Sequence, residues 1–171
     1  NWSENLLRLI PTLSFGLRSL FELSTWAWHL PNVVLHALNA ALIVALTIRI
    51  HPNPISALMA GLFFALSPLL VHPVEWVGGS YDLFATAGVL SCIIALIDKR
   101  TIIAAIAATV ALLSKENAMT LPIVAALIIV ATNGVPRIRS EWWAQFKQWA
   151  PILALALISL TIRAMQVSGA D

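Results

Sequence analysis

Two short polar segments carry the residues of this sequence whose types and spacing could do chemistry. They are residues 72–82 and 114–117, and each lies between long apolar stretches. The ionisable residues concerned are His72, Glu75, Asp82, Lys115 and Glu116. A carboxylate can accept the proton of an attacking hydroxyl, and an ammonium can stabilise a departing phosphate. Ionisable groups at membrane depth usually mark a substrate, ion or proton path, but two structural roles are equally open: Glu75 pairs with Lys115, and Asp82 caps a helix.

The elements that must position these residues are apolar helices. Apolar residues make up 60% of 171 positions and charged residues 11%, whereas soluble domains have about half and about a quarter. Nearly uncharged runs cover residues 33–50, 55–71, 78–97, 101–113, 118–132 and 149–162. Because a bilayer offers the backbone no water, such runs must be helical. The sequence predicts an all-α, polytopic transmembrane bundle of about six spans, with an external, amphipathic juxtamembrane segment at 1–30 and the bundle at 31–171.

Charge and cysteine content exclude several other classes of function. The net charge of +2 comes from basic residues scattered between the spans, so no nucleic-acid surface is expected. The single cysteine, Cys92, falls inside a predicted span and is interpreted as a small core residue. The histidines do not have the spacing of a zinc site, so the sequence predicts no metal.

The basic residues of the connections indicate an orientation. Residues 49–54, 98–100 and 133–148 carry six of them, whereas the opposite connections carry only Lys115. By the positive-inside tendency, the first set is cytoplasmic. The alternation of spans then places residues 72–82 and 114–117 together on the outer side, with the N-terminal stretch.

One span is too short for the membrane. Residues 101–113 rise only about 20 Å as a helix, and the hydrocarbon layer is about 30 Å thick. Lys115 and Glu116 should therefore lie below the outer surface, in a cavity that opens outward. In the neighbouring outer loop, Pro68 and Pro73 are expected to weaken and then end the preceding helix, and Asp82 to start the next one.

Other polar residues are interpreted as structural. His29, His36 and Asn39 share a helical face, which favours hydrogen bonds between helices. Residues 141–149 are rich in tryptophan and predict an interfacial helix that leads into the last span.

Several short motifs together resemble one family. The string His-Pro-Val-Glu-Trp at 72–76, with Asp82 seven residues after Glu75, is followed at 113–122 by Leu-Ser-Lys-Glu-Asn-Ala-Met-Thr-Leu-Pro. These blocks, with Trp-His-Leu-Pro-Asn at 28–32, resemble the multi-spanning region of the transmembrane and tetratricopeptide-repeat O-mannosyltransferases and their bacterial relatives, over roughly residues 14–125. Two departures concern the sites: Arg18-Ser19-Leu20 stands where the family has Arg-Pro-Leu, and Ser80 replaces a basic residue.

The resemblance implies a GT-C membrane glycosyltransferase. Such an enzyme transfers a hexose such as mannose from a polyprenyl- or dolichyl-phosphate to an acceptor, a protein or glycan, on the periplasmic or lumenal side of a bacterial inner membrane or the endoplasmic reticulum. The lipid-linked sugar is a substrate, and no cofactor is implied. The main catalytic base would lie upstream of this chain, which is therefore expected to be an inactive internal piece. The resemblance gives supporting catalytic roles to Glu75, His72 and Asp82, and substrate-binding roles to Lys115, Glu116 and Arg18.

A second function stays open on the sequence. A non-catalytic transporter or lipid flippase would also be polytopic, and it predicts related repeats in two halves and polar groups near the middle of the bilayer. The sequence has no evident internal repeat, and its polar groups cluster toward one side. That pattern favours the enzyme.

Overall fold

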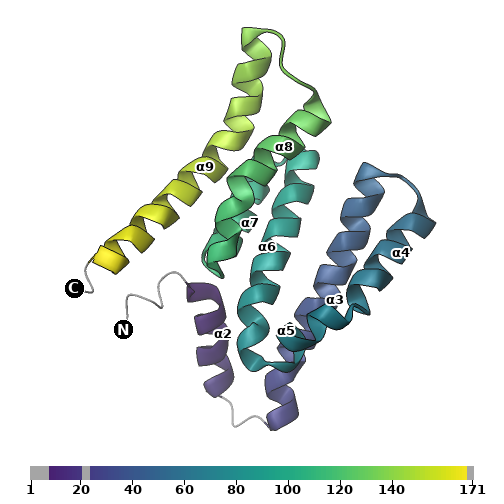
Figure 1. Cartoon of the computed structure of the whole chain (residues 1–171), viewed down its shortest axis with the longest axis vertical. Helices are drawn as coiled ribbons and strands as arrows, with labels where there is room; N and C mark the ends of the chain where they lie inside the picture. The colour runs from purple at the N-terminus through teal and green to yellow at the C-terminus, as the bar shows by residue number, and fades with distance from the viewer. Residues whose placement is uncertain (1–7, 21–23, 169–171) are drawn as a thin grey trace.

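The structure describes residues 8–20 and 24–168, which form helices joined by short connections. The computed structural model has, in chain order, α2 (Leu9–Ser19), α3 (Thr25–Ile50), α4 (Pro54–Ala65), α5 (Val71–Glu75), α6 (Ser80–Ile97), α7 (Thr101–Leu112), α8 (Leu121–Asn133) and α9 (Arg139–Ser168) (Figure 1). Short 3-10 turns lie at η1 (Pro68–Leu70), η2 (Val77–Gly79) and η3 (Glu116–Thr120). No strand occurs in the described residues, which confirms the all-α prediction.

Among the described residues, four helices are long and apolar enough to cross a membrane, so six spans are not confirmed. They are Trp26–Ile50, Val77–Ile97, Glu116–Asn133 and Arg139–Met165. A fifth crossing is possible only if α4 and the segment Pro68–Glu75, which meet at 49°, count as one broken span. The helix α7 has 12 residues, a rise of about 18 Å, and is too short to cross alone, as the sequence predicted.

The break after α4 lies earlier than the prolines suggested. The helix ends at Ala65, before Pro68, because a residue that precedes proline disfavours the helical conformation. Pro68 then begins η1, and Pro73 lies inside α5 instead of ending a helix. The expectation that Pro68 would only weaken the helix and Pro73 would end it is therefore wrong.

Two other predicted boundaries fall inside helices. The helix α3 begins at Thr25, so the boundary expected at residue 31 lies within it. Residues 141–149, interpreted as an interfacial helix, form the first turns of the continuous 30-residue α9, which contains Pro151. Membrane helices tolerate an internal proline because neighbouring groups satisfy the freed carbonyl.

The interior is built from small residues that let helices approach closely. Buried Ala104, Ala107, Ala108 and Ala111 form one face of α7 and lie against α6. At Gly88 of α6, an added Cβ would lie 2.7 Å from the backbone nitrogen of Ala111 and 2.8 Å from the carbonyl oxygen of Ala107, so only glycine permits this contact. Small residues at helix contacts are typical of membrane bundles, where close packing replaces the hydrophobic effect between helices.

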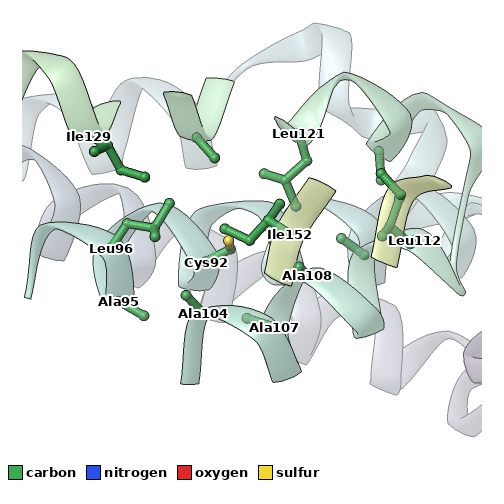
Figure 2. Packing of buried hydrophobic residues seen from close by; sticks show 14 residues of the cluster. Cys92, Ala95, Leu96, Ala104, Ala107, Ala108, Leu112, Leu121, Ile129 and Ile152 are labelled. Atoms are coloured by element: carbon green, nitrogen blue, oxygen red, sulfur yellow. The ribbon is translucent and has the colours of Figure 1, made fainter. Parts of the chain in front are cut away.

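Larger side chains close the same interior from the other helices. Figure 2 shows side chains of α6, α7, α8 and α9 meeting there, with Leu121, Ile129 and Ile152 among them. Cys92 is fully buried in this cluster, which confirms its interpretation as a core residue.

The bundle has two chemically different ends. The hairpin end carries the connections at 51–53, 98–100 and 134–138, at the upper side of Figure 1. The polar end carries α2, α5, the start of α6 and η3, and α2 is attached there by a hydrogen bond from the Ile10 amide to the carbonyl oxygen of Leu113 (3.4 Å). Segments 72–82 and 114–117 thus lie at one end together with α2, as the alternation of spans predicted.

Candidate functional site at the polar end

An ion pair joins the two polar segments. Lys115 Nζ donates to Asp82 Oδ1 at 2.5 Å, and the two side chains are 27% and 40% exposed. Asp82 lies in the first turn of α6, where a helix dipole favours an acid, as predicted. Lys115 follows the short α7 and immediately precedes η3, so the end of α7 positions it beside the first turn of α6. The pair is therefore half-buried and still accessible from outside the bundle.

The alternative pairing of Lys115 with Glu75 is wrong in this structure. Glu75 is exposed, and it has no ion-pair partner among residues 8–20 and 24–168. It lines an open hollow with His72 and Trp76, whose rings lie 5.7 Å apart between centroids. This carboxylate therefore stays available for a molecule that approaches from outside.

Glu116 holds two arginines that the sequence analysis did not assign. Its Oε2 lies 3.5 Å from Arg8 Nη2 and 3.9 Å from Arg163 Nη1. Arg163 comes from the far end of α9 and also donates to the carbonyl oxygen of Leu112 at 3.3 Å. The available signal was a lone arginine in the apolar sequence of the last span, since a charge there usually has a partner or a function.

Arg18 is the most buried cation of the polar end, at 6% exposure. It donates to the carbonyl oxygen of Trp28 at 3.0 Å and to Ser80 Oγ at 3.4 Å, and its guanidinium lies 5.4 Å from the centre of the Phe15 ring. Burial lowers the pKa of the Arg18 guanidinium from its ordinary value, because desolvation penalises the charged form. It nevertheless stays charged at neutral pH, because a guanidinium remains protonated in proteins.

Asn32 fixes the geometry between these groups. Its side chain is fully buried; Nδ2 donates to the carbonyl oxygen of Trp76 at 2.9 Å, and Oδ1 accepts from Ser80 Oγ at 2.5 Å. Ser80 begins α6, two residues before Asp82, and also accepts from Arg18. One hydrogen-bonded chain therefore runs from α2 through the start of α6 to α3 and the turn after α5. The Trp-His-Leu-Pro-Asn string at 28–32 was the signal for Asn32, although its role was not inferred.

The remaining polar residues of α3 join helices. His36 Nε2 lies 3.1 Å from the carbonyl oxygen of Ala65, and Asn39 Nδ2 donates to that of Leu83 at 3.1 Å. These contacts confirm the interhelical interpretation of both residues, and His29 is half-buried on the same helix. Within the described residues, no three His, Cys, Asp or Glu side chains come together in a group that could hold a metal ion.

The polar end has an excess of positive charge. Its cations are Arg8, Arg18, Lys115 and Arg163, and its paired carboxylates are Asp82 and Glu116. The guanidinium of Arg8 lies 5.5 Å from the centre of the Tyr81 ring. Tyr81 directly precedes Asp82 in the chain, so Arg8 links the Glu116 group to the start of α6. With the exposed Glu75 of α5 counted, four cations stand against three carboxylates, and the low-dielectric helices beneath this small positive excess favour the approach of an anion.

Comparisons of the chain with models of protein families, with curated protein sequences and with solved structures found no match.

Proposed function

We propose that this chain is the lipid-phosphate-binding part of a membrane glycosyltransferase of the GT-C class. The donor would be a hexose linked to a polyprenyl or dolichyl phosphate, and the acceptor a protein. The observation that carries the proposal is the gathering of four cations and three carboxylates, of which only Asp82 and Glu116 are paired with cations, at one end of an apolar bundle. A donor with a long hydrocarbon chain and a phosphate head would present its charge at such an end.

Lys115 is the proposed phosphate ligand. An ammonium has three donors, and Asp82 takes only one of them among the contacts of the described residues. The other two can turn toward an anion without breaking the ion pair. Arg163 and Arg8 share the single carboxylate of Glu116, so a bound phosphate could take the place of Glu116 as the partner of one of the two arginines. Contacts of this kind accelerate the reaction when they strengthen as charge develops on the leaving phosphate.

The reaction needs a base as well as an anion site. A carboxylate accepts the acceptor proton, the acceptor oxygen bonds to the anomeric carbon, and the bond from that carbon to the phosphate oxygen breaks. On this proposal, the base would be an acidic residue on an external loop of the whole enzyme. Glu75 and His72, which line the same open hollow, are given the supporting role of binding the acceptor. Asp82 is given the role of positioning Lys115.

Sugar transfer by the full-length protein tests the proposal. Membranes that contain the protein would be supplied with a labelled polyprenyl-phosphate hexose and assayed for labelled protein. Lys115→Met should reduce the rate at least about a hundredfold, the usual effect of removing one such charge-stabilising group. Glu75→Gln should reduce it about tenfold, chiefly through the acceptor's KM. Lys99→Gln, on the exposed connection between α6 and α7, is the control and should transfer at the wild-type rate.

Two results would contradict the proposal in different ways. Wild-type rates in both Lys115→Met and Glu75→Gln would refute the site assignment while leaving the class of enzyme intact. Movement of intact lipid-linked sugar across the membrane, without any transfer to protein, would instead identify a flippase.

A further inference from the structure

A separate apolar groove runs between α8 and α9 near the hairpin end. It is lined by Ala126, Ile129 and Val130 of α8 and by Trp142, Phe146 and Trp149 of α9, and its volume is about 210 Å³. A second hollow adjoins it across Trp142 and Phe146 and is also lined by Arg139, Ser140 and Trp143. We call the two hollows together the aromatic groove. Neither touches the polar end.

The mouth of the aromatic groove is positively charged. Trp142, Phe146 and Trp149 follow Arg139 by three, seven and ten residues, so one face of α9 carries a cation and then a column of aromatic rings. Arg137 lies two residues before Arg139, Lys147 lies farther along α9 and lines neither hollow, and the single acid between residues 133 and 149 is Glu141. That carboxylate already accepts a hydrogen bond from the backbone amide of Arg137 at 2.8 Å.

Hydrogen bonds hold the groove in shape. Trp149 Nε1 donates to the carbonyl oxygen of Pro122 at 2.8 Å, and Gln145 Nε2 donates to that of Gly134 at 2.9 Å. The rings of Trp143 and Phe146 stack at 5.5 Å between centroids. Because the indole N–H of Trp149 already has an acceptor, the ring presents an apolar surface to the groove. The lining side chains are held in place before a ligand binds, so binding costs little side-chain conformational entropy.

We propose that the aromatic groove binds one anionic glycerophospholipid. Its phosphate lies against Arg139, and an acyl chain follows Trp142 and Phe146 beside Ala126. Ten residues of helix from Arg139 to Trp149 rise about 15 Å, which is half the thickness of a hydrocarbon layer of about 30 Å. The groove thus has about the length of one leaflet, and the positive charge at its mouth favours a headgroup of net negative charge over a zwitterionic one.

Lipid retention by the purified full chain tests this. The protein would be reconstituted in vesicles of equal parts phosphatidylglycerol and phosphatidylcholine, extracted in mild detergent, and analysed by native mass spectrometry for bound lipid. We expect one retained phosphatidylglycerol, preferred about fivefold, as for one surface cation acting on an anionic lipid. Arg139→Gln should abolish the preference. Arg100→Gln, another exposed arginine at the same end, should keep it.

A groove-filling variant separates the acyl chain from the headgroup. Ala126→Phe, which places a ring in the groove, should reduce retention of both lipids at least about fivefold, while Arg139→Gln changes only the ratio between them. Equal retention of the two lipids by the wild-type protein would overturn the proposal without any variant. An equal loss of preference in Arg139→Gln and Arg100→Gln would overturn it as well, because it would indicate general charge attraction.

Discussion

The polar end and the hairpin end each contain an aspartate paired with a cation, and the two pairs differ in how completely their atoms are used. At the hairpin end, Arg49 Nε and Nη2 donate to the two carboxylate oxygens of Asp98 at 2.9 and 3.0 Å, and Nη1 donates to the carbonyl oxygen of Ala45. At the polar end, Lys115 reaches only one oxygen of Asp82. A bidentate pair is a closed structural link, whereas a pair made through one atom on each side keeps donors and an acceptor for another molecule.

The two ion pairs also differ in whether buried polar side chains lie beside them. The Arg49–Asp98 pair joins the end of α3 to the end of α6 across the surface. The Asp82–Lys115 pair lies beside the hydrogen-bonded chain of Arg18, Ser80 and Asn32. Unused donors and buried polar side chains therefore surround the Asp82–Lys115 pair, whereas the Arg49–Asp98 pair is complete by itself.

The largest expected effect concerns the glycines of the two ends. A Cβ at Gly79 would overlap the carbonyl group of Pro73, so Gly79→Ala should disrupt the turn that carries Glu75 and cost more than about 3 kcal/mol of folding free energy. Gly134, before α9, has φ of 81° and open space around it, so Gly134→Ala should cost only about 1–3 kcal/mol through backbone strain.

Thermal unfolding in detergent measures this difference, at about 2–4 °C per kcal/mol for a chain of this size. Gly16→Ala on α2 is the control. An added Cβ there would meet no side chain or other segment within 4 Å, so the substitution should be neutral or stabilising. A melting temperature that falls less in Gly79→Ala than in Gly134→Ala would show that the turn before α6 is not rigid.

A smaller effect is expected from one asparagine at each end. Asn32→Leu should cost about 1–3 kcal/mol, because it leaves the carbonyl oxygen of Trp76 without its donor, while Ser80 Oγ keeps the carbonyl oxygen of Val77 as an acceptor. Asn53→Ala should cost about 1 kcal/mol, because Asn53 accepts from the amides of Ile55 and Ser56 as the N-cap of α4.

The same melting experiment, run with both variants, ranks the two asparagines. The polar-end variant should also lose sugar transfer and the hairpin-end variant should not. Comparable transfer in the two variants would mean that the position of the α5 turn does not matter to the reaction.

The smallest expected effect is the pH dependence of the hairpin-end pair. The hydrogen bonds from Arg49 hold the pKa of Asp98 below its ordinary value of 3.8. A carboxyl group whose pKa is lower in the folded state contributes stability above its unfolded pKa, and that contribution is lost as the pH falls through the folded pKa. For a pair this exposed the contribution is below about 1 kcal/mol.

Melting temperatures of wild type and Asp98→Asn should therefore differ slightly at neutral pH and converge below pH 3.8. A difference that grows on acidification would contradict this sign. Sugar transfer at neutral pH should be the same in both proteins.

The sequence predicted those features that depend on local pattern. Apolar runs gave the helices, the short run before Lys115 gave the short α7, and the helix start gave the position of Asp82. Features that depend on distant pairing were missed. The sequence suggests Glu75 as the partner of Lys115 because both lie in polar segments. No local pattern indicates that Asp82 is the carboxylate that lies next to Lys115.

The ion pair of Arg163 could not be predicted from local sequence either. Its partner Glu116 is 47 residues earlier in the chain, and only the meeting of η3 with the far end of α9 brings the two together. The span count was missed for a local reason, because Pro68 ends the first apolar helix and the break at residues 66–67 separates two helices that hydropathy alone treats as one run.

We propose that the polar end binds a lipid phosphate through Lys115, so that its ion pair with Asp82 is more than a structural link. Exchanging the two charges tests it most directly. The double variant Asp82→Lys with Lys115→Asp keeps an ion pair between α6 and η3 but moves the ammonium away from the proposed phosphate position. We predict that it recovers most of the melting temperature lost in either single variant, while transfer from a polyprenyl-phosphate sugar stays at least about a hundredfold below wild type. Recovery of both stability and transfer in the double variant would show that the pair serves only to hold the bundle together.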